Sequence, residues 1–314
     1  MAPKHIITVE NLVKSYKKST KPAVDDISFY VEEGSFFSLL GPNGAGKTTT
    51  ISILTTTLAK TSGSVTIAGY DIDKESHSIR KSIGVIFQNP SLDLNLTAEE
   101  NVRIHAMLYG LYPFRPTYAL MPQAYKKVVG DLAEVLGISE DIHKPIKTFS
   151  GGMKRKLEII RSLTHNPKVL FLDEPTTGLD PLSRKNLWEY LQVVRQKNNT
   201  TIFLTTHYLE EAEGSDYLCV MGNGKIVTQG TPRDIKKALI DEYLLVSADS
   251  METLSQELKA KKIPYVVDVD GGFKMEMGKQ TAHEILKSIK TPLTQVHVHI
   301  PTLEEAYLEI ISRS

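Results

Sequence analysis

The stretch Gly41-Pro-Asn-Gly-Ala-Gly-Lys-Thr48 lies between an apolar run, Phe36 to Leu40, and a predicted helix from about Thr48 to Leu58. It fits the pattern G-x-x-x-x-G-K-[ST] and stands in the strand–loop–helix context that the pattern requires. The glycines let backbone N–H groups turn towards a phosphate, and the helix N-terminus adds its dipole. This context argues against a simple Gly-rich turn. The predicted nucleotide-binding residues of this segment are Gly41, Pro42, Asn43, Gly44, Ala45, Gly46, Lys47, Thr48 and Thr49.

Two side chains of this loop carry the expected chemistry. Lys47 should reach the β- and γ-phosphates of a nucleotide, and the Thr48 hydroxyl should ligate Mg²⁺. Such a loop occurs in several classes of nucleotide-hydrolysing proteins, so further residues must decide the class.

A second candidate segment, Val169-Leu-Phe-Leu-Asp173-Glu174, is an apolar strand that ends in two acids. Asp173 suits a contact to Mg²⁺ through water at the end of the strand. Glu174 can face the space in front of the γ-phosphate, where a base for an attacking water belongs. Taken alone, the segment could equally be an ordinary junction between a strand and a turn.

A third candidate is Ser150-Gly151-Gly152, which precedes the helical pattern MKRKLEIIRSL. A serine and two glycines at the start of a helix can form a second anion-binding terminus. In isolation, a simple N-cap is the more common reason for such a sequence, and a basic helix face is usually solvated.

Composition limits the function. The 314 residues include 37 Lys and Arg against 37 Asp and Glu, a neutral balance that argues against nucleic acid as a partner. One cysteine, Cys219, permits no intrachain disulfide and fits a reducing compartment. The apolar runs are too short to span a bilayer. We therefore expect a soluble, cytoplasmic chain whose role in any transport requires a separate membrane partner.

The order of predicted elements indicates an α/β protein with an added domain. Residues 5–40 are expected to form antiparallel strands, and 97–163 are mostly helical. VLFLD, TIFLTTH and YLCVMGNGKIV have the continuous apolar character of fully buried strands. The pattern changes after residue 235, and residues 236–314 are predicted to form a small α+β domain of ferredoxin-like type, with a hairpin turn at Asp270-Gly271-Gly272.

Taken in order, these motifs resemble the ATP-binding subunits of ABC transporters over about residues 5–235. The resemblance rests on seven positions, each with its own family motif. These are Tyr16, where the family stacks an aromatic ring on adenine, Gly41–Thr48 for Walker A, Gln88 in IFQNP for the Q-loop, FSGGM at 149–153 for the signature, VLFLDE at 169–174 for Walker B, Gly178-Leu179-Asp180 for the D-loop, and the switch His207.

The resemblance implies a P-loop NTPase fold with a RecA-like core, an antiparallel β-subdomain and a helical subdomain near residues 89–167. It implies two copies, head to tail, with ATP and Mg²⁺ between the P-loop of one chain and Ser150, Gly151 and Gly152 of the other, and with Asp180 at the same interface. Gln88 would sense Mg²⁺, Glu174 would polarise the water, and His207 would contact the γ-phosphate. The partners implied are a second ATPase subunit and an integral membrane permease, which would hold the chain on the inner face of the membrane.

Departures from the family pattern point to one branch. Phe149 and Met153 flank Ser-Gly-Gly where the family commonly has Leu and Gln. The form SGGMKRKL and the segment that begins at Pro301 look like the branch that drives drug, polysaccharide and ABC-2-type exporters. The Pro-rich loop at 112–122 either helps to select the permease partner or is an extension without a function of its own.

Two other functions stay open on the sequence. A soluble ABC-type ATPase that acts on nucleic acid or in cofactor assembly is the alternative. The second such function is that of a regulatory module that does not hydrolyse ATP, and the presence of Glu174 and His207 argues against it.

Overall fold

The computed structural model describes residues 4–17, 19–88, 91–239, 243–268, 271–277, 281–299 and 302–307. The chain divides into two compact units, Met1–Gln229 and Gly230–Ser314. The sequence placed the boundary after residue 235, which lies inside helix α8 (Pro232–Leu239) of the second unit. None of the helices in the described part of the chain has both the length and the apolar character that a bilayer span requires.

The first unit is organised around a six-stranded sheet whose inner strands are parallel. Its order is β10 (Lys225–Gly230), β9 (Tyr217–Gly222), β3 (Phe36–Leu40), β8 (Thr201–Thr206), β7 (Val169–Asp173) and β6 (Ile83–Ile86). Parallel pairing joins β9 to β3, β3 to β8, β8 to β7 and β7 to β6.

Two strand predictions need correction. The sequence grouped all of residues 5–40 as antiparallel, but β3 pairs in parallel in the core sheet. All five residues of FFSLL are buried, as expected for a strand covered on both faces. The run YLCVMGNGKIV is two strands rather than one, because Asn223 and Gly224 both have positive φ and turn the chain between β9 and β10. Residues of β10 alternate between exposed and partly buried, so only β9 is a buried strand.

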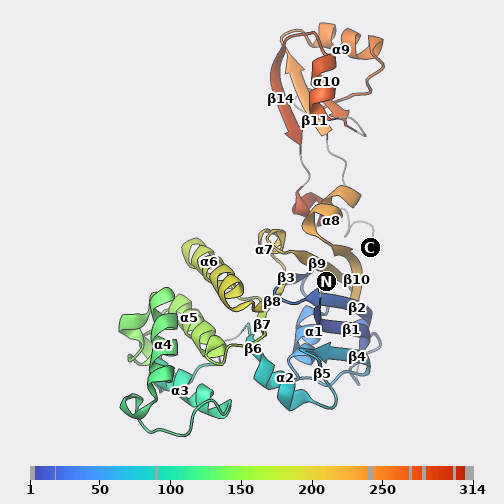
Figure 1. Cartoon of the computed structure of the whole chain (residues 1–314). Helices are drawn as coiled ribbons and strands as arrows, with labels where there is room; N and C mark the ends of the chain where they lie inside the picture. The colour runs from blue at the N-terminus through green and yellow to red at the C-terminus, as the bar shows by residue number, and fades with distance from the viewer. Residues whose placement is uncertain are drawn as a thin grey trace. The chain divides into compact units, whose positions relative to one another are not determined.

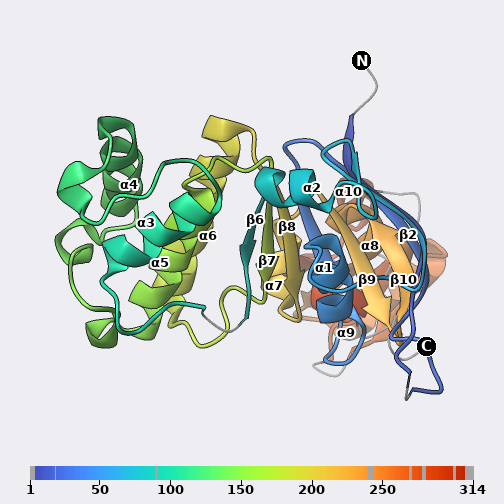
Figure 2. The same ribbon diagram turned by 90° about the horizontal axis from the view of Figure 1, so that it is seen from below.

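One face of the core sheet packs against an antiparallel sheet with helix α1 (Lys47–Leu54) between them (Figure 2). This second sheet has the order β2 (Val24–Glu32), β1 (His5–Lys14), β4 (Ser62–Ile67) and β5 (Tyr70–Asp71). Along β7 the side chains alternate, and Val169 and Phe171 face this layer. Helix α2 (Ser76–Ser82) then leads into β6.

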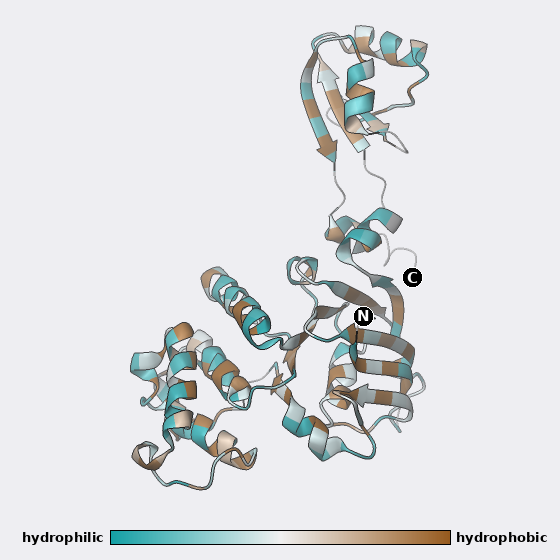
Figure 3. Cartoon of the chain, viewed as in Figure 1, coloured by the Kyte–Doolittle hydropathy of each residue, from teal (hydrophilic) through white to brown (hydrophobic). Residues whose placement is uncertain are grey.

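The opposite face of the core sheet meets the helices. Leu170 and Leu172 of β7 pack in the same cluster as residues of the helical region. The four long helices there are α3 (Ala98–Leu108), α4 (Gln123–Val135), α5 (Gly151–Leu163) and α6 (Pro181–Asn198). In Figures 1 and 2 α3, α4 and α5 gather beyond β6, on the side away from α1. Figure 3 shows apolar residues along the central strands and polar residues over the outer helix surfaces.

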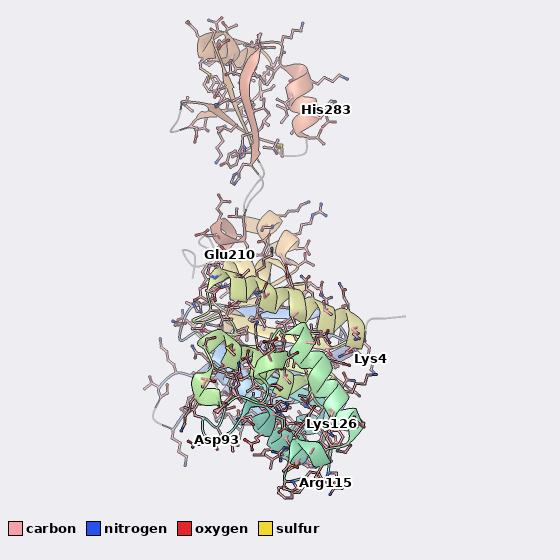
Figure 4. The ribbon with its side chains drawn as sticks, turned by 90° about the vertical axis from the view of Figure 1, so that its left-hand side faces the viewer. Lys4, Asp93, Arg115, Lys126, Glu210 and His283 are labelled. Carbon is pink, nitrogen blue, oxygen red and sulfur yellow. The ribbon has the colours of Figure 1, made fainter. Side chains whose placement is uncertain are left out.

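The Pro-rich loop at 112–122 is irregular apart from one 3-10 turn, Tyr118–Leu120. It is fixed to α3 by a buried ion pair: Arg103 Nε donates to Glu99 Oε1 at 3.0 Å, and Arg103 Nη1 donates to the Arg115 carbonyl at 2.6 Å. The Tyr125 hydroxyl also donates to Glu99, and the pKa of this phenol is raised, mainly by burial. Figure 4 labels Arg115 at the edge of this helical region.

The second unit has its own core and an antiparallel sheet of order β12 (Val266–Val267), β13 (Phe273–Glu276), β11 (Tyr243–Ala248) and β14 (Leu293–His299). With α9 (Met251–Ala260) and α10 (Ala282–Ser288), the elements follow the order strand, helix, strand, strand, helix, strand. That is the order of a ferredoxin-like domain. Residues 303–307 are helical. Asp270 of the expected hairpin turn and Pro301 and Leu308 of the terminal segment lie outside the described residues.

The division into units generates a prediction about nucleotide binding. A chain cut after residue 235 should bind ATP with an affinity close to that of the full chain, because the phosphate-binding loop and the strands β3, β7 and β8 beside it lie within Met1–Gln229. Calorimetric titration of both proteins with ATP measures this. A folded, monodisperse fragment that fails to bind nucleotide would contradict the prediction.

Candidate active site

Four segments reach the same edge of the core sheet because parallel strands end at the same edge. The loop after β3 leads into α1, and Gln88 follows β6. Strand β7 ends at Asp173, and β8 ends at Thr206, directly before His207. The sequence named residues from all four segments, and this edge is where the structure places them.

Backbone geometry of the loop depends on its glycines. Gly44 and Gly46 have φ of 82° and 106°, the left-handed region that glycine reaches without strain. A Cβ on Gly46 would lie 2.5 Å from the Ala23 carbonyl oxygen, so a side chain there would collide with backbone. The first turn of α1 therefore starts with N–H groups that point out of the helix towards the loop.

Lys47 is nearly buried, with 4% of its surface exposed. Its Nζ donates to the carbonyl oxygens of Gly41 at 2.8 Å and Pro42 at 3.0 Å. Burial lowers the pKa of this ammonium, and the nearby carboxylates of Glu174 and Asp173 oppose that effect. The positive charge is thus held directly beneath the loop, where an anion would meet it.

Glu174 is the point at which three side chains meet. Its Oε1 lies 3.8 Å from Lys47 Nζ, and its Oε2 accepts a hydrogen bond of 3.2 Å from Gln88 Nε2. His207 Nδ1 lies 3.2 Å from Glu174 Oε1, but the two groups are not aligned as a hydrogen bond, and Nδ1 has no other such partner in the described structure. Glu174 is 8% exposed and has a φ of 45°. A carboxylate so placed can accept a proton from a water in the loop cavity.

Asp173 is buried beside Glu174 and accepts a hydrogen bond of 2.5 Å from the Thr205 hydroxyl. Burial raises the pKa of Asp173, whereas the Thr205 hydroxyl lowers it. A cavity of about 300 Å³ lies over this edge, lined by Ala23, Asn43, Gly44, Gly46, Lys47, Thr48, Thr49, Gln88 and Glu174.

The residues present fit a nucleotide with Mg²⁺. Thr48 offers a hydroxyl oxygen and Gln88 an amide oxygen on the cavity wall, and Asp173 offers a carboxylate next to it. Oxygen donors of this kind are the ligands Mg²⁺ prefers, in a site shared with phosphates. The loop N–H groups and Lys47 suit the phosphates themselves.

Several predicted site residues do not line this cavity: Asp173 and His207 lie beside Glu174, whereas Tyr16, Ser150–Gly152 and Asp180 belong to other segments. The Ser150 hydroxyl caps α5 by accepting the Met153 N–H at 3.2 Å. Asp180 caps α6 by accepting the Ser183 N–H at 2.9 Å. Tyr16 is 44% exposed, and Lys14 Nζ lies 5.3 Å from the centre of its ring. The ring is therefore partly exposed to solvent, with the Lys14 ammonium over it.

The part that helix α5 plays in this site was not predicted from the sequence, because a basic helix face is usually solvated. Arg155 is buried and donates to the carbonyl oxygens of Phe87 at 2.6 Å and Pro175 at 2.8 Å, the neighbours of Gln88 and Glu174. Its partner Glu158 accepts the Ser91 N–H at 3.0 Å. The acid three residues after Arg155 was the signal in the sequence, since an i, i+3 pair can neutralise a buried guanidinium.

Many ATPases share a phosphate-binding loop and a pair of acids at a strand end. Here the chain between β6 and β7 forms a helical subdomain that ends in the capped Ser150-Gly-Gly helix. That insertion defines the class: the first unit is an ATP-binding cassette built on a P-loop NTPase core.

Comparison with known proteins agrees with this class. Residues 24–177 match the family model described as ABC transporter. The linearmycin resistance ATP-binding protein LnrL of Bacillus subtilis (strain 168) is 33% identical, with 98% of this chain and 99% of that protein covered. The doxorubicin resistance ATP-binding protein DrrA of Mycobacterium tuberculosis (strain CDC 1551 / Oshkosh) is 38% identical, covering 76% and 69%.

Among solved structures, a dimeric bacterial ABC transporter cassette is 25% identical, with a TM-score of 0.63, and covers 72% of this chain and 98% of that one. The chain belongs to the family of ABC transporter ATP-binding proteins, and it is an ATPase. The resemblance inferred from the ordered motifs is confirmed, and so is the P-loop NTPase fold.

The position of Glu174 predicts the effect of removing its charge. Glu174→Gln should lower the rate of ATP hydrolysis by about 10²–10⁴-fold, the usual loss for a positioned base. ATP affinity should persist, because Lys47 and the loop are unchanged. Steady-state hydrolysis and equilibrium ATP binding measure the two effects. Hydrolysis at the wild-type rate would remove Glu174 from the role of base.

Proposed function

We propose that this chain is the ATP-hydrolysing subunit of an ABC-2-type exporter, that it works as a head-to-tail dimer, and that it drives a separate membrane permease. One observation supports the dimer: Lys47, Gln88 and Glu174 line one cavity, with His207 beside Glu174, while the Ser150–Gly152 helix start is not part of it. A second chain would bring its own Ser150–Gly152 to complete the site.

Hydrolysis then follows from the residues at the cavity. Bound Mg²⁺ would supply positive charge to the phosphates, held by Thr48, Gln88 and Asp173. Lys47 would exchange the Gly41 and Pro42 carbonyls for phosphate oxygens. Glu174 would take the proton of the attacking water.

Three more residues complete the proposed site. His207 would turn from Glu174 to the γ-phosphate, which its unpaired Nδ1 allows. Tyr16 would stack on adenine. Asp180 would lie at the contact between the two chains, near the start of α6.

A membrane partner accounts for the surface of the helical subdomain. Large apolar side chains are exposed on its loops and on α3, among them Leu108 at 81% and Phe114 at 69%, together with Leu94, Ile104, Leu111 and Leu120. Exposed apolar side chains on neighbouring segments are typical of protein–protein contact surfaces. The names of the two resistance proteins support export, and the permease would hold this chain on the inner face of the membrane.

The composite site predicts that two inactive variants complement each other. Lys47→Ala removes the charge beneath the loop. Gly151→Asp places a carboxylate at the start of α5, where it should repel the γ-phosphate; a Cβ on Gly151 meets no atom within 4 Å, so the fold should tolerate it. Gly152→Asp is less suitable, because its Cβ would lie 3.3 Å from the Ser183 hydroxyl oxygen.

Each variant alone should be inactive, and a mixture should regain hydrolysis, because one site of the heterodimer contains neither change. ATPase assays on purified, differently tagged heterodimers measure this. Heterodimers of wild type with each variant serve as the control for coupling between sites. If those controls hydrolyse ATP while the mixed pair does not, the two motifs do not meet across the dimer.

A second experiment tests the membrane partner. The tagged chain, purified from detergent-solubilised membranes of its own cells, should bring with it an integral membrane protein. Leu108→Glu together with Phe114→Glu should reduce that recovery, while ATP binding persists. Recovery with a nucleic-acid or cofactor-assembly complex instead would favour the soluble ATPase function.

A further inference from the structure

Pairing of β7 with β8 stops just before the residues that do chemistry. The last pair in the ladder is Asp173 with Thr205, and the Glu174 N–H donates to the Thr205 carbonyl at 3.0 Å. Beyond this bond the two segments turn away from the sheet as 175–177 and 207–208. On its other edge β8 stays paired with β3 up to Thr206, opposite Leu40. The β7–β8 pairing therefore ends before His207 and does not by itself set the position of His207 relative to Glu174.

Glu211 lies between these two segments. It belongs to the short helix α7 (Leu209–Glu213), and it is 6% exposed. Its Oε1 accepts a hydrogen bond from the Thr176 hydroxyl, two residues after Glu174. Its Oε2 accepts a hydrogen bond of 2.6 Å from the Thr206 hydroxyl, one residue before His207. One carboxylate therefore bridges the two segments.

The same bridge fixes the turn that carries His207. The Thr206 hydroxyl oxygen also accepts a hydrogen bond of 2.9 Å from the Tyr208 N–H. Because the Thr206 hydroxyl donates its proton to Glu211, its lone pairs are left to accept this backbone N–H. The ring of Tyr208 lies 4.0 Å from the ring of His207, centre to centre. The guanidinium of Arg184 lies 5.2 Å from the centre of the Tyr208 ring.

Both hydroxyls that meet Glu211 are fully buried. Burial raises the pKa of Glu211, and the two hydroxyls and the charge of Arg184 oppose this. Loss of one acceptor oxygen leaves the buried hydroxyl that it satisfies without a partner, which is unfavourable. This carboxylate does not line the nucleotide cavity.

We propose that Glu211 is a positioning residue for ATP hydrolysis: by bridging Thr176 and Thr206 it holds the backbone that carries His207 beside the backbone that carries Glu174. The proposal rests on the hydrolytic roles proposed for those two residues. It predicts a loss in turnover with little loss in nucleotide affinity, because Glu211 contacts neither the phosphate-binding loop nor the nucleotide cavity in the described structure.

Glu211→Gln keeps the shape of the side chain but replaces one acceptor oxygen with a donor. Since a misplacement of about 1 Å can lower a rate 10²-fold, kcat should fall between about 10-fold and 10²-fold. The dissociation constant for ATP should change by less than about twofold, as for an interaction used only in the chemical step. The matched control is Glu210→Gln, next in sequence and exposed at the surface (Figure 4), which should leave both values unchanged.

Thr176→Val tests the bridge from its other end, with Thr177→Val as the exposed control. It should lower kcat less than Glu211→Gln does, and combining the two changes should lower kcat by less than the product of their separate effects. If Glu211→Gln does not fold, this pair of threonine variants decides the matter.

Wild-type kcat in folded Glu211→Gln or in Thr176→Val would overturn the proposal. So would a parallel loss of kcat, ATP affinity and melting temperature, which would mean that Glu211 only supports the fold. Measuring Glu174→Gln in the same assay distinguishes failure of the proposed hydrolytic site from failure of the role proposed for Glu211. If that variant still hydrolyses ATP, the proposed site itself is wrong, whereas an inactive Glu174→Gln beside a fully active Glu211→Gln removes only the role of Glu211.

Discussion

Parallel pairing of β3, β8 and β7 is the constraint on which the rest of the structure depends. It forces three strands to end at one edge and so delivers the phosphate loop, the acid pair and the histidine to one place. The pairing is stabilised by burial on both faces, since every residue of β3, β7 and β8 is buried. At about 1.5–3 kcal/mol for each large apolar side chain, these strands resist displacement far more strongly than the loops they position.

Several charged side chains are buried together at this edge of the sheet. Two carboxylates, Asp173 and Glu174, lie near a single ammonium, Lys47, so the site has an excess of negative charge before any ligand arrives. Arg155 lies behind them, bonded to the backbone beside Glu174 and to Glu158. Removal of one buried partner leaves the other uncompensated, which commonly costs several kcal/mol. A divalent cation fits such a site because its positive charge offsets this excess of negative charge.

The sequence predicted what short-range patterns determine. The P-loop, the acid pair at the end of β7 and the capped start of α5 depend on neighbouring residues, and they could be identified without coordinates. The assignment of β3 failed because a five-residue apolar run does not reveal whether its partners run parallel. Arg155 and Glu211 were missed for another reason: each also bonds a partner far along the chain, Phe87 at 68 residues from Arg155 and Thr176 at 35 from Glu211, and the nearby partners Glu158 and Thr206 do not reveal these distant contacts.

The left-handed backbone of Glu174 has a consequence for the engineering of this family member. A φ of 45° is costly for a residue with a long side chain and free for glycine. A substitution that relieves this strain would therefore raise the stability of the fold and at the same time remove the carboxylate that lines the cavity. Selection of variants by thermal tolerance alone would favour glycine at this position. If Glu174 is the base proposed above, the selected proteins would bind ATP without hydrolysing it.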